Sequence, residues 1–170
     1  VLKLSELLRY MLYECNAPEV LLWKELEFIR NYVDLEQLRY GERLDLSLTI
    51  SGEYQHKRIA PLLLIPFLEN AFKHGTSEQR EQAWMHIDLS VQGQTLKFKL
   101  INSREAMPHD DTYIGGIGLQ NVKKRLQLLY PDCHDLRITA EDETFMIFLT
   151  LELSPVADTV EKANQLAAIA

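Results

Sequence analysis

The sequence has few cysteines, no long apolar segment and a deficit of positive charge. Only two cysteines, Cys15 and Cys133, occur in 170 residues, and neither a CxxC spacing nor histidines at metal-ligand intervals accompany them. We therefore expect reduced thiols and a cytosolic compartment. No apolar run approaches the roughly 18 residues of a membrane span, and no signal peptide pattern opens the chain. Eighteen Lys and Arg against 25 Asp and Glu give a net charge of -7, which argues against a nucleic acid partner.

Length and composition predict one well-buried core with a helical appendage, because 46% of the 170 residues are apolar. A second full domain is not expected, and no internal repeat is present. The chain begins at Val1, inside a helical pattern and without a start methionine. This beginning predicts a fragment of a longer protein.

Hydrophobic periodicity predicts two helices followed by a mixed α/β segment. Apolar residues recur at helical spacing from Leu2 to Leu12 and from about Glu19 to Tyr40, and the break at Pro18 between them predicts an antiparallel hairpin. Later helices are predicted over 61–74 and 118–130, and strands over 44–50, 84–91, 95–101, 136–140 and 145–153. The order favours an α/β (α+β) two-layer sandwich with helices on one face of a mixed, mostly antiparallel sheet.

The segment 61–75, PLLLIPFLENAFKHG, predicts a helix with one apolar and one polar side. Measured from Glu69, Lys73 lies at about 40°, Asn70 at about 100° and His74 at about 140° around the helix axis. Glu69 and Asn70 offer the oxygen ligands that Mg²⁺ prefers, and Lys73 and His74 offer donors to phosphate oxygens. An ordinary amphipathic helix with a solvated polar face remains the alternative. The opposite arc carries the apolar residues, namely Leu64, Ile65, Phe67, Leu68, Ala71 and Phe72.

A second motif, GGIGLQN at 115–121, runs from a loop into a predicted helix. Glycines permit close backbone approach, and the free amides at a helix start favour anions such as a triphosphate. Glycines also serve as ordinary loop residues, so this motif alone leaves both interpretations open. The GxxxxGK[ST] phosphate loop and the βαβ setting of a dinucleotide fold are both missing. Arg125, on the same helix, is a candidate for either a phosphate contact or a surface role.

Together, PLLLIPFLENAFKHG and GGIGLQNVKKRLQLLYP resemble the N box and G box of the ATP-binding domain shared by gyrase, Hsp90, histidine kinases and MutL. LSELLRYMLY and WKELEFIRNYVDLEQLRYGERL resemble the dimerisation region of LytS-type sensor histidine kinases. The resemblance covers residues 1 to about 153. It implies a Bergerat-type fold with three parts: 1–43, a partial dimerisation region lacking the phosphoacceptor histidine; 44–153, a GHKL-type ATP-binding catalytic domain; and 154–170, a tail of unknown role.

The resemblance also implies the chemistry of a two-component protein kinase. The γ-phosphoryl of Mg-ATP would pass to a histidine upstream of the fragment and then to a response-regulator aspartate. Asn70 would bind Mg²⁺ and Glu69 would polarise the metal shell, which makes both candidate catalytic residues. The implied ATP-binding residues are Asn70, Lys73, His74, Asn102, Gly116, Gly118, Leu119 and Asn121. The implied partners are a second copy of the protein and a response regulator, and the implied location is the cytoplasmic part of a bacterial sensor anchored in the inner membrane.

Two departures from the family pattern keep a rival function open. The DxGxG segment of the family, whose aspartate accepts a hydrogen bond from the adenine amino group, is represented only by Asn102 and the residues after it. The amide oxygen of Asn102 can still act as an acceptor. The PHFLFN-like acceptor segment is absent, and none of the five histidines lies on the first two predicted helices. The rival is a degenerate, ATP-independent module for dimerisation and docking; an ATPase or serine kinase sharing only the nucleotide fold is a third hypothesis.

Overall fold

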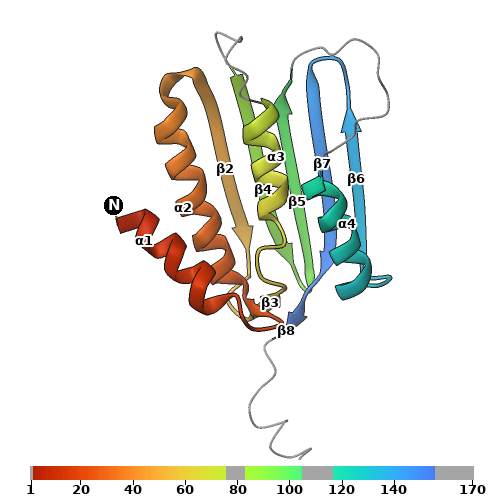
Figure 1. Cartoon of the computed structure of the whole chain (residues 1–170). Coiled ribbons are helices and arrows are strands. Elements are labelled where there is room, and N and C mark those ends of the chain that lie inside the picture. The colour runs from red at the N-terminus through yellow and green to blue at the C-terminus, as the bar shows by residue number, and fades with distance from the viewer. Residues whose placement is uncertain (1, 76–82, 105–116, 156–170) are drawn as a thin grey trace, which may run out of the picture.

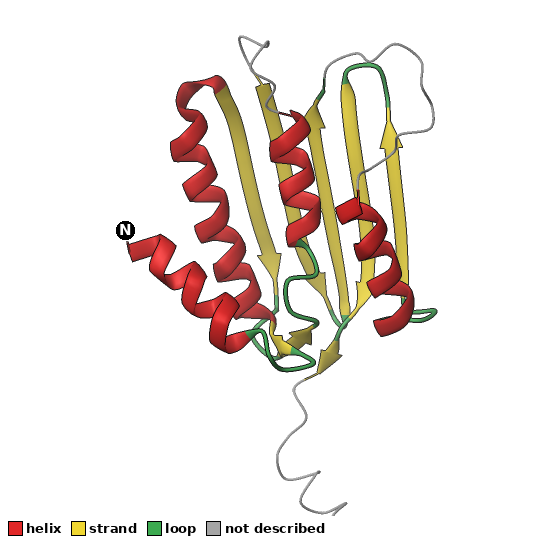
Figure 2. Cartoon of the chain, in the orientation of Figure 1, coloured by secondary structure: helices red, strands yellow, loops and turns green. Residues whose placement is uncertain are grey.

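The computed structural model describes residues 2–75, 83–104 and 117–155 of the chain (Figure 1). A five-stranded sheet forms one layer, and the helices lie against one of its faces (Figure 2). The helical elements are α1 (Leu2–Arg9), the π-helical turn η1 (Tyr10–Glu14), α2 (Leu22–Tyr40), the short 3₁₀ turn η2 (Gly41–Arg43), α3 (Ile65–Gly75) and α4 (Ile117–Leu129). The strands are β1 (Val20–Leu21), β2 (Leu44–Gly52), β3 (Lys57–Ile59), β4 (Ala83–Gln92), β5 (Thr95–Ser103), β6 (His134–Ala140), β7 (Thr144–Glu152) and β8 (Ser154–Pro155).

The main sheet has the strand order β2-β4-β5-β7-β6. Strands β4, β5, β7 and β6 pair antiparallel in turn, whereas β2 pairs parallel to β4. This parallel pair follows from the crossover through β3 and α3, because two parallel neighbours need a long connection. The predicted two-layer sandwich and its mixed, mostly antiparallel sheet are therefore confirmed. A second, three-stranded sheet in the order β1-β3-β8 was not predicted.

The core lies between the helices and one face of the main sheet. Strand β5 shows the reason, because its residues alternate between buried and exposed positions along most of its length. Phe98 of β5 meets Phe67 of α3 with ring centroids 5.7 Å apart, and both side chains are buried. Every apolar residue predicted for the inner arc of α3 is buried: Leu64, Ile65, Phe67, Leu68, Ala71 and Phe72.

Two predicted helix boundaries were wrong. The helix expected over 61–74 begins at Ile65, because Leu62 takes a φ of 53° in the preceding turn and Pro66 is tolerated only in a first helical turn. The helix expected from Glu19 begins at Leu22, because Val20 and Leu21 pair with β3. Strand pairing replaced the local helical tendency at residues 20–21. At the turn before α3, Arg125 bonds the carbonyls of Pro61 and Leu62 instead.

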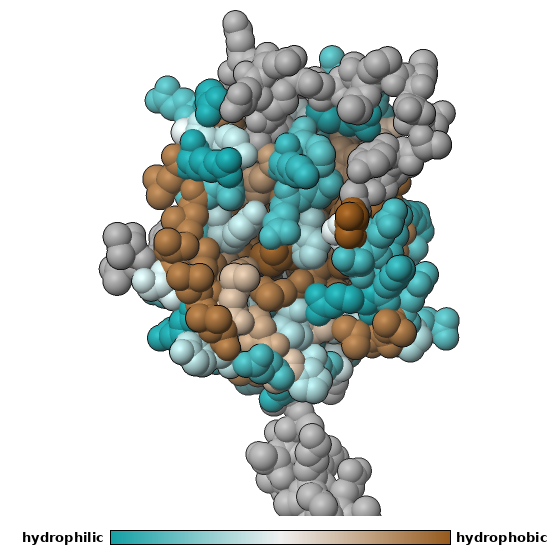
Figure 3. Space-filling model, viewed as in Figure 1, coloured by the Kyte–Doolittle hydropathy of each residue, from teal (hydrophilic) through white to brown (hydrophobic). Residues whose placement is uncertain are grey.

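The first two helices form the predicted hairpin, with α1 and η1 packed against α2 (Figure 1). One side of α1 and η1 is apolar but uncovered: Leu4, Leu8, Met11, Leu12 and Tyr13 are each at least half exposed. Figure 3 shows apolar residues gathered over this side of the molecule, whereas hydrophilic residues cover the outer face of α3 and the middle of α4. Exposed apolar side chains lie at the two ends of α4, namely Ile117, Leu128 and Leu129. Within the described residues no helix is both long and apolar enough to cross a bilayer.

Candidate functional site

The polar side of α3 faces away from the core, as its spacing predicted. Glu69, Lys73 and His74 are exposed and Asn70 is half-buried. Within the described ranges, these four side chains make no hydrogen bond or ion pair. The C-terminal half of α3 therefore presents a carboxylate, a carboxamide, an ammonium and an imidazole that are not used for folding.

The imidazole of His74 is biased toward its neutral form. Partial burial lowers its pKa, and the adjacent Lys73 ammonium lowers that pKa further. A neutral imidazole carries one N–H donor, and an anion bound beside it would favour the second proton. This end of α3 can therefore respond to a bound phosphate by taking up a proton.

Asn102 lies at the end of β5 and is almost fully buried, with 1% of its surface exposed. Its Nδ2 donates a hydrogen bond to the backbone carbonyl of Ser103 at 2.8 Å. Its Oδ1 is buried with no hydrogen-bond partner among the described residues. A buried acceptor without a donor is costly, so this oxygen is suited to a ligand that brings its own N–H group. The resemblance to the family's DxGxG segment identified Asn102, but the sequence could not identify the carbonyl that orients the amide.

The start of α4 supplies backbone amides, and no acidic side chain lies in its first turn. Gly118 is exposed, its φ is not positive, and a Cβ built on it would meet nothing within 4 Å. The glycine motif predicted that Gly118 needs either a backbone conformation that side chains disfavour or the close approach of a phosphate. The observed backbone removes the first reason, and the second stays a prediction. The side chain of Leu119 is 1% exposed and belongs to the core, so only its amide could meet a ligand. Asn121 is exposed, and Gly116 lies outside the described residues.

Arg125 has a structural role in the fold that neither of its two sequence interpretations named. Its Nη2 donates to the carbonyl of Pro61 at 2.8 Å, and its Nη1 donates to the carbonyl of Leu62 at 3.2 Å. The guanidinium therefore ties α4 to the turn that leads into α3. It is committed to this contact and does not face a phosphate.

Three neighbouring elements carry the candidate residues, and the start of α4 lies farther from the end of the helical layer than the C-terminal ends of α3 and β5 do (Figure 1). The C-terminal ends of α3 and β5 and the N-terminal end of α4 point toward the same end of the molecule (Figure 1), and α3 packs against both α4 and β5. The connecting segments 76–82 and 105–116, which include His109, Asp110 and Asp111, fall outside the described residues. In the part of the chain that the structure describes, no group of three or more His, Cys, Asp or Glu side chains is placed to hold a metal ion. A divalent cation here would need oxygens of its ligand in addition to Asn70, as Mg²⁺ bound to a nucleotide has.

Comparisons with known proteins agree with this geometry. Residues 1–44 match the family model described as histidine kinase. The chain is 28% identical over 126 residues to the sensor histidine kinase BtsS of Escherichia coli K12, which covers 74% of this chain and 22% of BtsS. It is 34% identical over 92 residues to the sensor protein kinase HptS of Staphylococcus aureus USA300, which covers 54% of this chain and 18% of HptS. The chain thus spans about a fifth of the length of these relatives.

Solved structures show the same fold. The nucleotide-free catalytic domain of the histidine kinase ThkA aligns with a TM-score of 0.55 at 14% identity, covering 79% of this chain and 93% of that one. The histidine kinase domain of the blue-light-activated kinase of Erythrobacter litoralis aligns with a TM-score of 0.57 at 15% identity, covering 74% and 63%. The chain therefore has the fold of histidine kinase catalytic domains, and its sequence relatives support a fragment of a sensor histidine kinase.

Proposed function

We propose that this chain is the ATP-binding catalytic part of a two-component sensor histidine kinase, which positions Mg-ATP for transfer of its γ-phosphoryl group to a histidine. The observation that carries the proposal is the buried Oδ1 of Asn102, which has no hydrogen-bond partner among the described residues. Asn102 is at the C-terminal end of β5, which lies at the same end of the helical layer as the C-terminal end of α3. An adenine amino group would supply the donor that this oxygen lacks.

Each candidate residue then has one role. Asn102 accepts from the adenine amino group while its own amide is held by Ser103. Asn70 gives a neutral oxygen to Mg²⁺, and Glu69 polarises the water shell of the metal. Lys73 and His74 donate to phosphate oxygens. Backbone amides at the start of α4, from Gly118 to Asn121, add donors for the phosphates, as Gly116 does in the family pattern.

Catalysis in this scheme is mainly positioning and charge neutralisation. A bound magnesium ion would offset charge on the phosphates, and the chain would hold the γ-phosphorus in line with the attacking imidazole. No covalent chemistry is required of the α3 side chains. The phosphoryl group would then pass to an aspartate of a response regulator.

The finer assignments are part of the same proposal. We assign residues 1–43 to the dimerisation region and 44–153 to a GHKL-type domain of the LytS type, with 154–170 as a tail without an assigned role. The exposed apolar side of α1 and η1, which includes Leu4, Leu8 and Leu12, supports a homodimer, because a stripe of this kind is normally covered. In this scheme the chain is a cytoplasmic domain of a bacterial sensor anchored in the membrane.

Titration calorimetry with ATP, in the presence of Mg²⁺ and in EDTA, tests the function. We expect the parent chain to bind Mg-ATP, and Asn70→Ala to weaken Mg-ATP binding much more than binding of metal-free nucleotide. Asn16→Ala serves as the matched control, because Asn16 is exposed and bonds only to the Leu12 carbonyl in the hairpin. An equal loss in both conditions would remove Asn70 from the metal shell.

The rival function makes the opposite prediction for the parent chain. A degenerate docking module would give no heat of nucleotide binding with or without Mg²⁺, although its fold would be intact. The replacement of the family aspartate by Asn102 motivates this rival. The Oδ1 acceptor of Asn102, which has no partner among the described residues, argues against the rival.

The five histidines of the chain should take up no acid-labile phosphate from γ-labelled ATP, because none lies in residues 1–44.

A further inference from the structure

Glu25 is a charged side chain that the fold buries completely, with 0% of its surface exposed. It lies on α2, far in sequence from every residue of the candidate nucleotide site. Burial raises the pKa of its carboxyl group, while the Tyr10 hydroxyl, the backbone amides of Leu62 and Leu63, and the Arg125 guanidinium act to lower it. A buried carboxyl group is costly and needs compensating donors. Among the described residues, Tyr10 donates a hydrogen bond to Oε2 of Glu25 and Oε1 has no hydrogen-bond partner, while the other groups that lower the pKa come from the turn before α3 and from α4.

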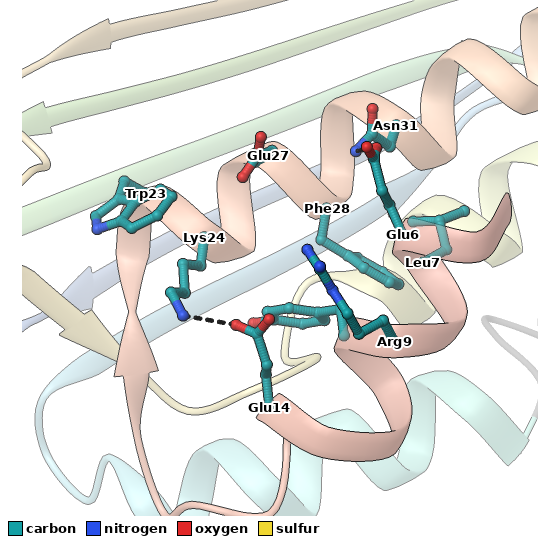
Figure 4. Close-up of a pocket in the computed structure, with 10 residues that line it drawn as sticks. Glu6, Leu7, Arg9, Glu14, Trp23, Lys24, Glu27, Phe28 and Asn31 are labelled. Carbon is teal, nitrogen blue, oxygen red and sulfur yellow. Dashed lines mark hydrogen bonds and ion pairs between the residues drawn. The ribbon is translucent and has the colours of Figure 1, made fainter. Parts of the chain in front are cut away.

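Tyr10 makes the first connection, between η1 and α2. Its hydroxyl donates to Oε2 of Glu25 at 2.5 Å, and its ring packs on Phe28 with centroids 4.8 Å apart. Nearby, the Lys24 ammonium and the Glu14 carboxylate meet at 2.7 Å across the groove of about 170 Å³ between η1 and α2, as Figure 4 shows. The seating of the first helix on the second is therefore set by specific polar contacts, and the Tyr10 contact is the buried one.

The second connection is to the turn that leads into α3. The amide of Ala60 donates to the Tyr130 hydroxyl at 2.8 Å, and Arg125 holds the carbonyls of Pro61 and Leu62. Leu62 has a φ of 53°, a conformation that non-glycine residues adopt only when their surroundings impose it. Side chains from the end of α4 hold one side of this turn. On the other side, α2, which carries Glu25, packs against β3, the strand that leads into the turn, and the backbone of Leu62 and Leu63 is close enough to lower the pKa of the Glu25 carboxyl group.

We propose that Glu25 is a positioning residue that joins the α1–α2 hairpin to the turn at residues 60–63, so that the Tyr10–Glu25 hydrogen bond couples the seating of α1 to nucleotide affinity at α3. The coupling rests on the proposed function, because α3 carries the nucleotide groups. The turn at residues 60–63 connects the two regions, because it leads directly into α3, which begins at Ile65. A shift of the hairpin that breaks the hydrogen bond would release the turn on one side and change the position of Asn70 and Lys73.

Tyr10→Phe tests the link, because it removes one hydroxyl and keeps the ring on Phe28. Tyr13→Phe is the matched control, since Tyr13 is 75% exposed three residues along the same turn. We expect Tyr10→Phe to speed amide hydrogen exchange at residues 60–64 and to weaken Mg-ATP binding by roughly fivefold or more, the lower end of measured couplings between sites. The control should match the parent in both measurements. Both variants are compared at a temperature where circular dichroism shows them fully folded.

Arg125→Lys provides the second variant, because it replaces the rigid, planar fork of the guanidinium, which bonds two neighbouring carbonyls, with a compact ammonium on a flexible stem. Arg137→Lys is its control, since that side chain is 75% exposed on β6. If the turn transmits the effect, the losses of affinity in Tyr10→Phe and Arg125→Lys should combine to less than their product in the double variant. Independent, multiplicative losses would overturn the shared turn as the link.

The two proposals fail in different ways. If the parent chain binds Mg-ATP and Tyr10→Phe behaves like Tyr13→Phe in exchange and in affinity, the coupling is wrong and the proposed function stands. If the parent chain binds no Mg-ATP, the proposed function and the coupling fall together. In that case the exchange measurement still decides whether Glu25 and Tyr10 anchor the turn.

Discussion

Asn102 and Glu25 are both buried polar residues with an oxygen that no described group bonds, yet their surroundings differ. Glu25 is enclosed by groups of the chain itself, including the Tyr10 hydroxyl and the guanidinium of Arg125. Asn102 is held through its amide nitrogen by the next residue only, which leaves its oxygen as an acceptor at the end of a strand. The first arrangement completes a connection inside the fold. The second is what a site for a hydrogen-bonding ligand requires.

The α1–α2 hairpin and α3 also differ in whether their polar side chains have partners. In the hairpin, polar side chains meet one another, as Lys24 meets Glu14 and Asn31 meets Glu6. On the C-terminal half of α3, the exposed polar groups have no partner within the described ranges. Polar groups that a fold leaves unused at one place, above a well-packed apolar face, are better explained by binding than by stability. The following changes test that difference, from the largest expected effect to the smallest.

Phe67→Ala should have the largest effect, because both regions depend on the seating of α3. Phe67 is fully buried against Phe98, and truncation of a buried phenylalanine costs about 3–5 kcal/mol of folding stability. Urea denaturation followed by circular dichroism gives this value. Leu8→Ala is the control, since Leu8 is 50% exposed on α1, and should change the free energy of unfolding of the monomer little. Equal losses in both variants would contradict the separation of core and surface described for α3 and α1.

The alkylation rates of the two cysteines compare the surroundings of Glu25 with an exposed position, because Cys15 lies near Glu25 and Cys133 is exposed. Burial, together with the negative charges of Glu25 and Glu14, raises the pKa of Cys15 to about 11. Because only the thiolate reacts, Cys15 should be alkylated about 100-fold more slowly at pH 8 than a thiol with an ordinary pKa near 9. Cys133 is exposed and serves as the internal reference. Mass spectrometry after timed iodoacetamide treatment measures both sites, and the difference should vanish in denaturant. Similar rates in the native protein would mean that the environment of Glu25 is open to solvent.

Asn102→Ala tests the candidate nucleotide site. If Oδ1 accepts from the adenine amino group, its removal should weaken ATP binding by about 1–3 kcal/mol, because the ligand donor is then buried without a partner. The same substitution should weaken the binding of a purine nucleotide that lacks the amino group much less. Calorimetry with both ligands therefore separates a lost contact with adenine from a change in the local fold. Equal losses for the two nucleotides would mean that Asn102 acts through the local fold and not through adenine.

Much of the fold followed from local patterns, and the exceptions have a common cause. The rotation of about 100° per residue assigned the buried and exposed sides of α3 correctly, because that face is set by a repeating apolar pattern. Strands β1, β3 and β8 have two or three residues each, too few to show a period, and each forms only through pairing with distant segments. The same holds for the turn before α3, where an apolar run resembles a helix but Leu62 is held in another conformation.

The site shows the same division. Helical periodicity pointed to Asn70 and Lys73, and these side chains lie on the outer side of α3 as that pattern predicted. Asn102 came from the resemblance to a family motif and lies buried at the end of β5. The carbonyl contacts of Arg125 and the burial of Glu25 left no signal in the sequence. A charged residue between apolar ones on a helix is normally exposed, and only tertiary packing reveals that Glu25 is enclosed. Contacts between distant elements therefore account for what the sequence could not reveal.

His74 gives the smallest and most specific effect, through pH. Its pKa in the free protein is lowered by burial and by Lys73, so the imidazole loses its proton more readily than in the unfolded chain. Through this group, folding stability should therefore decrease as the pH falls through the ordinary histidine range. A bound phosphate would act in the opposite direction by raising the pKa of His74, so ATP binding should take up a proton.

Affinity for Mg-ATP should consequently rise as the pH falls from 7.5 toward 6, because proton uptake and binding are linked. The side chain is exposed, so the gain should be modest, on the order of 1.5- to 5-fold as for an exposed ion pair. Calorimetric titrations in buffers of different ionisation enthalpy count the protons taken up. His74→Gln should abolish the part of the pH dependence that comes from this residue, whereas His56→Gln, in the exposed loop between β2 and β3, should retain it. If both variants keep the pH profile of the parent, His74 does not contact the phosphates, and the polar end of α3 binds nucleotide through Asn70 and Lys73 without it.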